Sequence, residues 1–329
     1  MNVRNSILKG ATAAARFHNE LQSEDQIKRN FGSVDVFSSV GKANAVLIFR
    51  PLHGLLGACL PGPTTGVIIS TQRPLAIQRF TAAHELGHVV MDHQDASLDS
   101  HSILNKTECL PEDMEIQANS FAAAFLTPKW LIAIHGRKQG WNWEDLKDPL
   151  IVYQLSLRLG ASYQATCIAL KTHNWIDPVL FEALWKVPRK GIKEKLLHGY
   201  RPNHWRRNVW RLSEKDEGTV VQGEPEDLFF FCLNEKSGSG YLWDINDLKN
   251  KGFLIVNDVR GTYPDSVGVD AQRQIITESE LPAKGEVLLA QRRPWNRLAL
   301  PVEQLHLTYD LLGKEEGLPR FTRQQLTAA

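Results

Sequence analysis

The sequence predicts an α+β protein with a mixed N-terminal part, a helical middle and an all-β C-terminal part. Short apolar runs between prolines and glycines give way to helical spacing after Pro74. A basic stretch, residues 186–211, then interrupts the apolar pattern, and short strand-like runs follow after about residue 217. A chain of 329 residues is too long for one typical core, so we expect two or three domains.

The first 70 residues predict one helix and three short strands. Residues 2–22 are amphipathic and contain no continuous apolar core of a signal sequence. Apolar runs at 45–50, 54–60 and 66–70 are separated by prolines and glycines, which predicts a small antiparallel sheet. No apolar stretch approaches the roughly 20 residues of a membrane span, so we expect a cytoplasmic protein with no membrane partner.

Helical spacing then continues for about 100 residues. We expect helices over residues 75–92, 111–127 and 130–137, the last followed by Gly140. Residues 149–173 predict two short helices around a Leu-Gly-Ala-Ser turn, with Ser162 as the cap of the second. The expected packing face of this pair consists of Leu155, Leu159, Ala165 and Ile168.

Composition excludes several classes of protein. Hydrophobic content of 43% and charged content of 23% are ordinary for a globular chain. The net charge of +1 predicts no polyanion partner for the chain as a whole. Four dispersed cysteines without a CxxC pair argue against a disulfide framework and a zinc ribbon, and indicate reduced thiols.

The sequence His84-Glu85-Leu86-Gly87-His88 is an HExxH motif. Positions i and i+4 share one face of a helix, so both imidazoles can reach one ion at about 2.0–2.1 Å. Glu85 lies beside the ion rather than on it, where it can act as general base on a zinc-activated water. The motif alone is a moderate signal, since a surface helix with two histidines and one acid also fits it.

A third ligand turns the motif into a metal site, because catalytic zinc keeps three protein ligands and one open position. Glu115 lies in the next predicted helix, where it shares a face with Ala118, Asn119 and Ala122. Small residues on that face would let the two helices approach closely. Asn119 could orient a ligand histidine, and Cys109 could occupy the open position and keep the site latent. An ordinary loop thiol is the simpler interpretation of Cys109.

These motifs resemble the ImmA/IrrE family of metallo-endopeptidases. The family pattern is HExxH, then ExxAxxFA, then Leu-x-Pro, and the chain matches it from His84 to Pro128. The resemblance implies a zincin-like domain with one zinc ion per chain, ligands His84, His88 and Glu115, and Glu85 as base. It also implies a substrate class: a helix-turn-helix repressor or antitoxin, cleaved in response to stress or DNA damage.

Two later segments are candidates for nucleic-acid binding. Residues 155–170 resemble the helix-turn-helix-like element of the same family, but their expected exposed side chains, Tyr163, Gln164 and Thr166, carry no charge. Residues 186–211 contain nine Lys or Arg and one acid. Arg206 and Arg207 could hold the backbone of single-stranded DNA, or another activating ligand, while Trp205 or Trp210 stacks on bases. A solvated linker with tryptophans in the core is the favoured interpretation.

The C-terminal part predicts a β-sandwich. Strand-like runs occupy residues 227–233, 254–256, 274–277, 287–290 and 304–309. The order Gly-Tyr-Leu-Trp at 240–243, Gly-Val-Asp at 268–270 and Arg-Pro-Trp at 293–295 resembles the chagasin family of immunoglobulin-like cysteine peptidase inhibitors. That resemblance implies protein-binding loops containing Tyr241, Trp243, Arg293 and Trp295. The first loop lacks the Asn-Pro-Thr-Thr portion, so we expect the fold and a protein-binding or autoregulatory role rather than inhibition.

The sequence therefore predicts a peptidase domain at 1–146, a helical segment with a basic linker at 147–216, a sandwich at 217–312 and a C-terminal tail at 313–329. We expect about the last dozen residues of this tail to be frayed. The leading hypothesis is a regulatory zinc endopeptidase of the HExxH-plus-Glu type. The C-terminal domain would then select the substrate or regulate the site. The rival hypotheses are a protein-binding or DNA-binding regulator in which the peptidase fold is only a scaffold.

Overall fold

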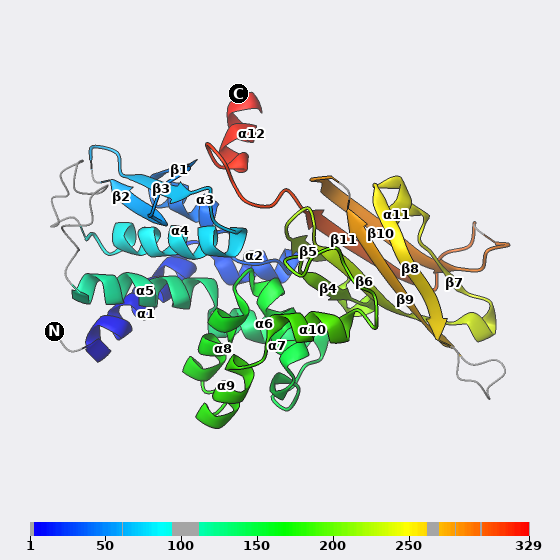
Figure 1. Cartoon of the computed structure of the whole chain (residues 1–329). Helices are drawn as coiled ribbons and strands as arrows, with labels where there is room; N and C mark the ends of the chain where they lie inside the picture. Colours follow the sequence, from blue (N-terminus) through cyan, green and yellow to red (C-terminus); the bar gives the residue numbers. More distant parts are fainter. Residues whose placement is uncertain are drawn as a thin grey trace.

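A computed structural model describes residues 3–60, 62–93, 112–261, 270–279, 281–296 and 298–328. The N-terminal region lies at one end of an elongated molecule, a group of helices forms the middle and two β-sheets form the other end (Figure 1). The N-terminal region comprises α1 (Val3–Glu20), α2 (Ser23–Asn30), α3 (Val36–Lys42), β1 (Val46–Arg50), β2 (Gly57–Leu60), β3 (Gly66–Ser70), α4 (Leu75–Val90), α5 (Glu112–Leu126) and α6 (Lys129–Gln139).

The N-terminal sheet is mixed, so the expected antiparallel sheet was wrong. Its strand order is β1-β3-β2, with β1 parallel and β2 antiparallel to β3. Strands β2 and β3 are consecutive in the chain and adjacent in the sheet, whereas residues 51–56 carry the chain from one edge of the sheet to the other. Local strand patterns do not encode this crossover. Helix α4 covers one face of the sheet, and α5 and α1 lie beyond it (Figure 1).

The middle helices are η1 (Asp145–Lys147), α7 (Pro149–Leu159), α8 (Tyr163–Thr172), α9 (Pro178–Trp185) and α10 (Arg189–Leu196). The α7–α8 pair confirms the predicted turn, because Gly160 has φ +63° and the Ser162 side chain accepts a hydrogen bond from the Ala165 N–H.

The predicted packing face of α8 was wrong in part. Ile168 is 46% exposed, whereas Tyr163 and Thr166, which we expected to be exposed, are buried. The hydroxyl of Tyr163 donates to the Leu184 carbonyl, and Thr166 bonds back to Ser162. These hydrogen bonds let polar-tipped side chains occupy the interior, which a purely apolar pattern does not anticipate.

The C-terminal region is a sandwich of two four-stranded sheets, as predicted. One sheet has the order β5-β11-β10-β7 and the other β4-β6-β9-β8. Its elements are β4 (Val209–Leu212), η2 (Glu214–Asp216), β5 (Thr219–Gln222), β6 (Leu228–Glu235), η3 (Ser237–Ser239), β7 (Leu242–Asp244), α11 (Asn246–Asn250), β8 (Phe253–Gly261), β9 (Ala271–Ser279), β10 (Lys284–Arg292) and β11 (Glu303–Asp310).

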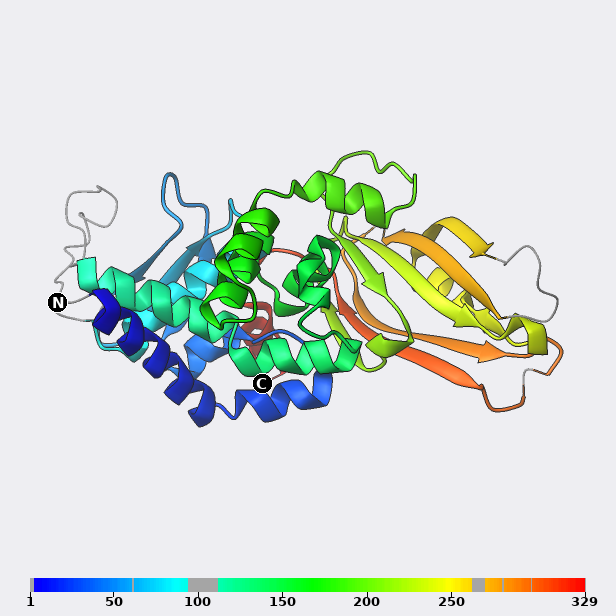
Figure 2. The same cartoon turned by 90° about the horizontal axis from the view of Figure 1, so that it is seen from below.

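The position of strand β6 explains why its sequence is continuously apolar and does not alternate between apolar and polar residues. Phe229, Phe231 and Leu233 face the interior of the sandwich, while Leu228 and Phe230 belong to the core shared with the helices. The sheet containing β6 is therefore covered on both faces. Strand β4 lies beside β6 although it precedes residue 217, where we expected the β region to begin. Figure 2 shows the middle helices between this sheet and α5.

The C-terminal tail is ordered, contrary to the expectation that its end is frayed. Gly317 forms a bridge with Phe49 on β1, and α12 (Arg320–Ala328) follows it. The Glu315 side chain is 7% exposed. The tail thus runs from the sandwich back to the N-terminal sheet (Figure 1). In the parts of the chain that the structure describes, no helix combines the length and the apolar character needed to cross a membrane.

Candidate metal centre

The HExxH residues lie in the second half of α4, and the acid lies in the first turn of α5. Both helices have the bounds that the sequence predicts within two residues. His84 and His88 are one turn apart on α4, so their rings lie on one face with centroids 4.8 Å apart. Glu115 approaches that face from α5, which packs against α4. The structure thus brings the three predicted ligands together.

The two imidazoles and the carboxylate lie close together. Nε2 of His84 lies 3.1 Å from Nε2 of His88. The Glu115 carboxylate spans the pair, with Oε2 3.4 Å from His84 Nε2 and Oε1 3.6 Å from His88 Nε2. Among the described residues, His84, His88 and Glu115 are the group of metal-ligating type whose ligand atoms all fall within 4.8 Å of one another.

This arrangement fits a small tetrahedral cation. Ligands at about 2.0–2.1 Å from a tetrahedral zinc ion are about 3.3–3.4 Å from one another. The shortest distances between the three groups, from 3.1 to 3.6 Å, bracket that value, with a different Glu115 oxygen nearest each imidazole. Two imidazoles and one carboxylate also form the donor set that catalytic zinc takes when it retains an open position. The residues present therefore fit a zinc ion.

The other nitrogen of each ring is also held. Nδ1 of His84 lies 3.1 Å from Oδ1 of Asn119, as predicted, and Nδ1 of His88 lies 2.9 Å from Nδ1 of His93. Each Nδ1 can then donate its proton, which leaves both Nε2 atoms free to coordinate. The sequence does not predict His93 as a partner of His88, because His93 follows the end of α4 and matches no family spacing.

The charges of the site stabilise an anionic Glu115. The hydrogen bond with His84 lowers the pKa of Glu115. Burial opposes protonation of His84, but the hydrogen bond and charge of Glu115 raise its pKa overall. Burial and the neighbouring His84 lower the pKa of His88 to about 4. The site therefore offers at least one neutral imidazole and a carboxylate to a cation at neutral pH.

Glu85 has the environment of a general base. Its side chain is 8% exposed, and burial raises its pKa to about 7. It also forms a hydrogen bond with the backbone of Cys59 on β2, which fixes it beneath the edge of the sheet. A carboxylate whose pKa lies near neutrality can both accept and return a proton.

Close packing of α4 on α5 permits this arrangement. A Cβ added to Gly87 would lie 3.1 Å from Cβ of Phe121 and 3.2 Å from Cα of Ala118. The small residues in the ExxAxxFA stretch thus serve the approach of the helices, as the sequence predicts. Gly10 likewise lets α1 pack closely on α5, because a Cβ added at Gly10 would overlap the Gln117 carbonyl oxygen.

Family comparison agrees with the geometry. Residues 36–171 match the model of peptidase family M78, described as the IrrE N-terminal-like domain. This segment is similar to the IrrE N-terminal-like domain. The matched segment includes His84, Glu85, His88 and Glu115, and it confirms the resemblance that the motifs indicate. The matched model is that of a metallopeptidase family, and the matched segment of this chain contains the candidate metal site.

Solved structures show weaker likeness to the chain. A cysteine protease inhibitor from Entamoeba histolytica is 21% identical, covers 33% of this chain and 99% of its own, and has a TM-score of 0.30. Amebosin is 18% identical, with coverage of 31% and 96% and a TM-score of 0.26. A Mycobacterium tuberculosis transcriptional regulator is 12% identical, with coverage of 82% and 80% and a TM-score of 0.28. No match was found among curated proteins.

The candidate latency thiol, Cys109, lies outside the described residues.

The candidate nucleic-acid residues differ in their exposure to solvent. Trp210 is 2% exposed and donates its indole N–H to Asp227, so it cannot stack on a base. Arg207 pairs with Glu278, while Arg206 is exposed and Trp205 is half-buried.

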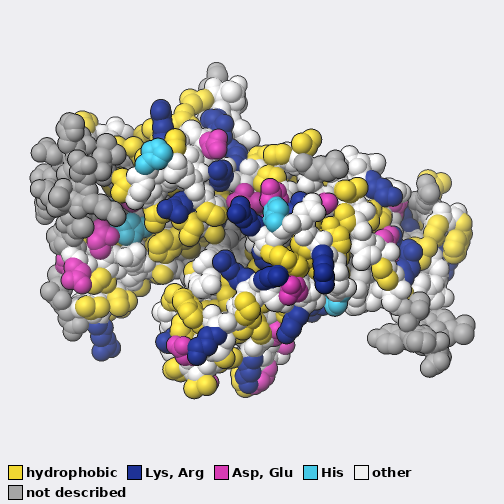
Figure 3. Space-filling model, in the orientation of Figure 1, with side chains coloured by type: hydrophobic (Ala, Val, Ile, Leu, Met, Phe, Trp, Pro, Cys, Tyr) yellow, Lys and Arg dark blue, Asp and Glu magenta, His cyan; other side chains and the backbone are white. Residues whose placement is uncertain are grey.

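Charge on the surface also argues against a dedicated nucleic-acid face. Lys193 is buried and donates to the carbonyls of Trp205 and Arg206, and burial lowers its pKa to about 8. On the face drawn in Figure 3, basic side chains over the helical middle are interspersed with acidic ones. Both observations favour the interpretation of residues 186–211 as a structural connection beside the IrrE N-terminal-like domain.

The candidate protein-binding loops lie at the end of the sandwich far from the IrrE N-terminal-like domain (Figure 1). Trp243 is not available to a partner, because it is 3% exposed and donates its indole N–H to the Asn234 carbonyl. Tyr241 and Arg293 form a cation–π pair at 4.7 Å, and Trp295 is 73% exposed. Gly268 and Val269, from the middle loop, lie outside the described residues.

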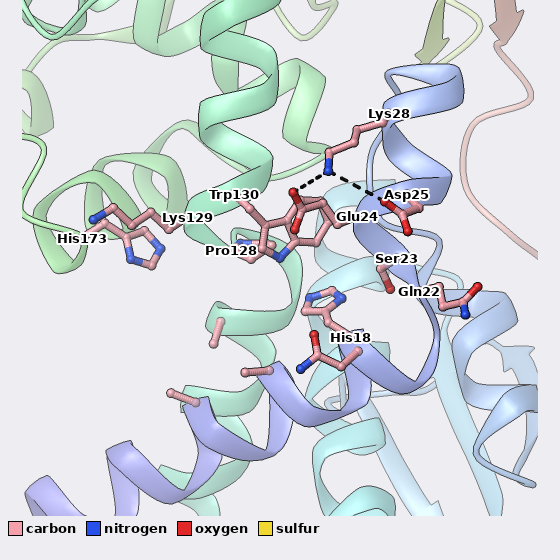
Figure 4. A pocket seen from close by; sticks show the side chains of 14 residues that line it. His18, Gln22, Ser23, Glu24, Asp25, Lys28, Pro128, Lys129, Trp130 and His173 are labelled. Carbon is pink, nitrogen blue, oxygen red and sulfur yellow. Dashed lines mark ion pairs between the residues drawn. The ribbon is translucent and has the colours of Figure 1, made fainter.

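A separate cavity of about 490 Å³ lies between α1, α2 and the turn from α5 to α6 (Figure 4). Its described lining includes His18, Trp130 and His173 but none of the metal-site side chains. The Lys28 ammonium at its rim pairs with Glu24 and Asp25. The cavity is thus distinct from the candidate metal centre.

Proposed function

We propose that this chain is a regulatory, site-specific zinc endopeptidase of the HExxH-plus-Glu type. One observation carries the proposal: two imidazoles of α4 and the Glu115 carboxylate of α5 approach one another as closely as the ligands of a tetrahedral zinc ion, within a segment that matches a metallopeptidase family. His84, His88 and Glu115 would hold one zinc ion per chain, and Asn119 and His93 would orient the two imidazoles.

Glu85 would carry the proton transfer. A bound zinc ion supplies a lowered pKa for water and polarisation of the scissile carbonyl. Glu85 accepts the proton of the attacking water and returns it to the leaving nitrogen, a task that suits a pKa near 7. Its burial keeps bulk water from competing for that proton.

We propose a helix-turn-helix repressor or an antitoxin as the substrate, with cleavage in response to stress. The support is the family match of residues 36–171. The C-terminal sandwich would contribute substrate recognition or regulation. Three apolar side chains of the β10–β11 loop support this role, because Trp295, Leu298 and Leu300 are 73%, 100% and 90% exposed. Exposed apolar groups concentrated on one loop favour contact with another protein.

The test of the enzyme is co-expression with the repressor or antitoxin encoded by a neighbouring gene, followed by fragment analysis. We expect a specific fragment with the wild type and none with Glu85→Gln, which keeps the shape of the side chain. Glu112→Gln, in the same first turn of α5 as Glu115, is the matched control and should leave cleavage intact. Equal cleavage by wild type and Glu85→Gln would refute the assignment of the base.

A second candidate function is a regulator without catalysis, in which the domain is a scaffold. The exposed Arg206 and half-buried Trp205 are the residues that favour binding of single-stranded DNA. Metal analysis separates the two functions. Near-stoichiometric zinc that is lost in His84→Ala but kept in His306→Ala supports the peptidase. Salt-dependent DNA binding by a zinc-free chain, lost on reversal of Arg206 and Arg207, would support the regulator.

A further inference from the structure

The first five residues of α4 contact four separate parts of the chain. The Leu75 N–H donates to the Glu224 carboxylate, which lies in the turn between β5 and β6 of the sandwich, at 3.3 Å. Gln78 contacts the C-terminal tail. Arg79 donates to the carbonyls of Gly160, between α7 and α8, and of Val34. The same helix carries His84, Glu85 and His88 at its other end.

Glu224 supplies a cap that α4 lacks locally. The preceding residue, Pro74, offers no side-chain cap to the free N–H groups of the first turn. A carboxylate at this position also interacts favourably with the helix dipole. The turn that carries Glu224 is itself fixed, because buried Asp227 accepts from the backbone N–H of Glu224 and from the indole of Trp210. The sandwich therefore holds the start of α4 through a rigid turn.

Gln78 attaches the tail to the same turn of the helix. Its side chain is 1% exposed. Its amide nitrogen donates to the carbonyls of Glu315 and Ser70, and its amide oxygen accepts from the Glu315 N–H. Two further hydrogen bonds, of 2.7 and 3.0 Å, join Gly317 to Phe49 on β1. The tail is thus paired with both the metal-site helix and the sheet that lies on it.

The position of α4 matters for the metal because its ligands move with it. Gln78 and His84 are about 9 Å apart along the helix axis, within one rigid element. A shift of α4 by a fraction of an ångström displaces both imidazoles relative to Glu115 on α5. Metal sites require ligand placement within about 0.5 Å. The contacts at Leu75 and Gln78 fix that placement from outside the matched domain.

We propose that Gln78 and Glu224 are positioning residues, through which the sandwich and its tail set the place of α4 relative to Glu115. This inference rests on the proposed metallopeptidase function. It makes the C-terminal region part of the scaffold of the metal site, and not only a module for recognition. The rival explanation is that the same contacts add stability without affecting the geometry of the ligands.

The experiment measures zinc affinity by competition with a chelating indicator in the full chain, together with the thermal midpoint of the zinc-free protein. Gln78→Leu and Glu224→Ala should weaken zinc binding by about tenfold, the low end of effects seen for groups that orient metal ligands. Glu224→Gln keeps an acceptor for the Leu75 N–H and should recover most of the affinity. Glu226→Ala, in the same turn but exposed, should bind zinc like the wild type.

Leu289→Ala, in the sandwich core on β10, provides the control for stability alone. It should lower the thermal midpoint without weakening zinc binding. The absorption of bound cobalt(II) gives a second readout, and we expect altered intensity in Gln78→Leu but not in Leu289→Ala. Wild-type zinc affinity in Gln78→Leu and Glu224→Ala would overturn the inference and leave the proposed function intact. Failure of the wild type to bind zinc would instead refute the proposed function.

Discussion

At the scale of single residues, the site depends on which nitrogen of each imidazole is free. Both Nε2 atoms face Glu115, and both Nδ1 atoms have a partner. The sequence predicted the ligands and Asn119, because HExxH and the small face of α5 are local patterns. It could not predict His93, whose ring returns to His88 only because the chain turns at Met91 and Asp92, where Asp92 has φ +54°.

The two orienting residues provide the first prediction. His93→Ala and Asn119→Ala should each weaken zinc binding by about 10- to 100-fold, because the freed imidazole loses its preferred tautomer and orientation. Chelator competition measures the affinity. His306→Ala, on the far strand β11, is the matched control and should bind zinc normally. Unchanged affinity in His93→Ala would show that this ring does not orient His88.

Two buried histidines outside the site predict a pH dependence of stability. Burial lowers the pKa of His18 to about 4 and that of His135 to about 3, and each ring contacts a backbone carbonyl. The folded pKa lies below the unfolded value of about 6.5, so the unfolded chain binds the proton first as pH falls. Stability should therefore decrease from about pH 6.5 downward, by about 2 kcal/mol for each ring at pH 5.

Urea denaturation of the zinc-free protein at pH 7 and pH 5 checks this sign. His18→Gln should reduce the slope of unfolding free energy against pH by the contribution of about one proton. His306→Gln, which alters an exposed ring, should keep the wild-type slope. The same slope in His18→Gln and the wild type would contradict a neutral, buried His18.

At the scale of elements, the helices were predictable and the order of strands was not. The bounds of α4, α5 and α6 follow from Pro74, Pro128 and Gly140, which act locally. The strand order β1-β3-β2 depends on a crossover that no local signal encodes. Strand β4 escaped prediction because it has only four residues and begins inside the basic stretch, and its partner β6 lies well beyond it in the sequence.

The contact between α4 and α5 gives the element-scale prediction. Gly87→Ala places a Cβ against the backbone of Ala118, so the helices must separate by a few tenths of an ångström. We expect weaker zinc binding, despite a gain in helix propensity of about 1 kcal/mol. Gly136→Ala in α6 is the matched control, because its Cβ meets only the Trp141 carbonyl at 3.7 Å. That variant should be stabilised and bind zinc normally, and equal zinc affinity in both would contradict the packing argument.

At the scale of the whole molecule, buried polar groups join the parts. Arg158 of α7 pairs with Asp216 of η2 at 2.6 Å, and both side chains are 1% exposed. Asp216 also accepts from Gln139 of α6 and from the Ser213 N–H. Such pairs of distant residues carry no signal in one sequence, so the attachment of the sandwich to the helices could not be predicted. The return of the tail to β1 was missed for the same reason.

This junction predicts a large loss of stability on removal of one partner. Asp216→Ala leaves the Arg158 guanidinium buried without its charge partner and should cost about 3–5 kcal/mol. Urea denaturation measures the loss. Asp244→Ala, an exposed acid on β7, should change stability little. If Asp216→Ala loses no more free energy of unfolding than ordinary surface variants, the pair does not hold the helices to the sandwich.

The central claim is that His84, His88 and Glu115 bind one zinc ion between α4 and α5. Anomalous diffraction at the zinc absorption edge, from crystals of the zinc-loaded chain, tests it most directly. We expect one strong peak at about 2.0–2.1 Å from Nε2 of both histidines and from a carboxylate oxygen of Glu115. A structure with no peak there, or with Glu115 turned away from the imidazoles, would contradict it.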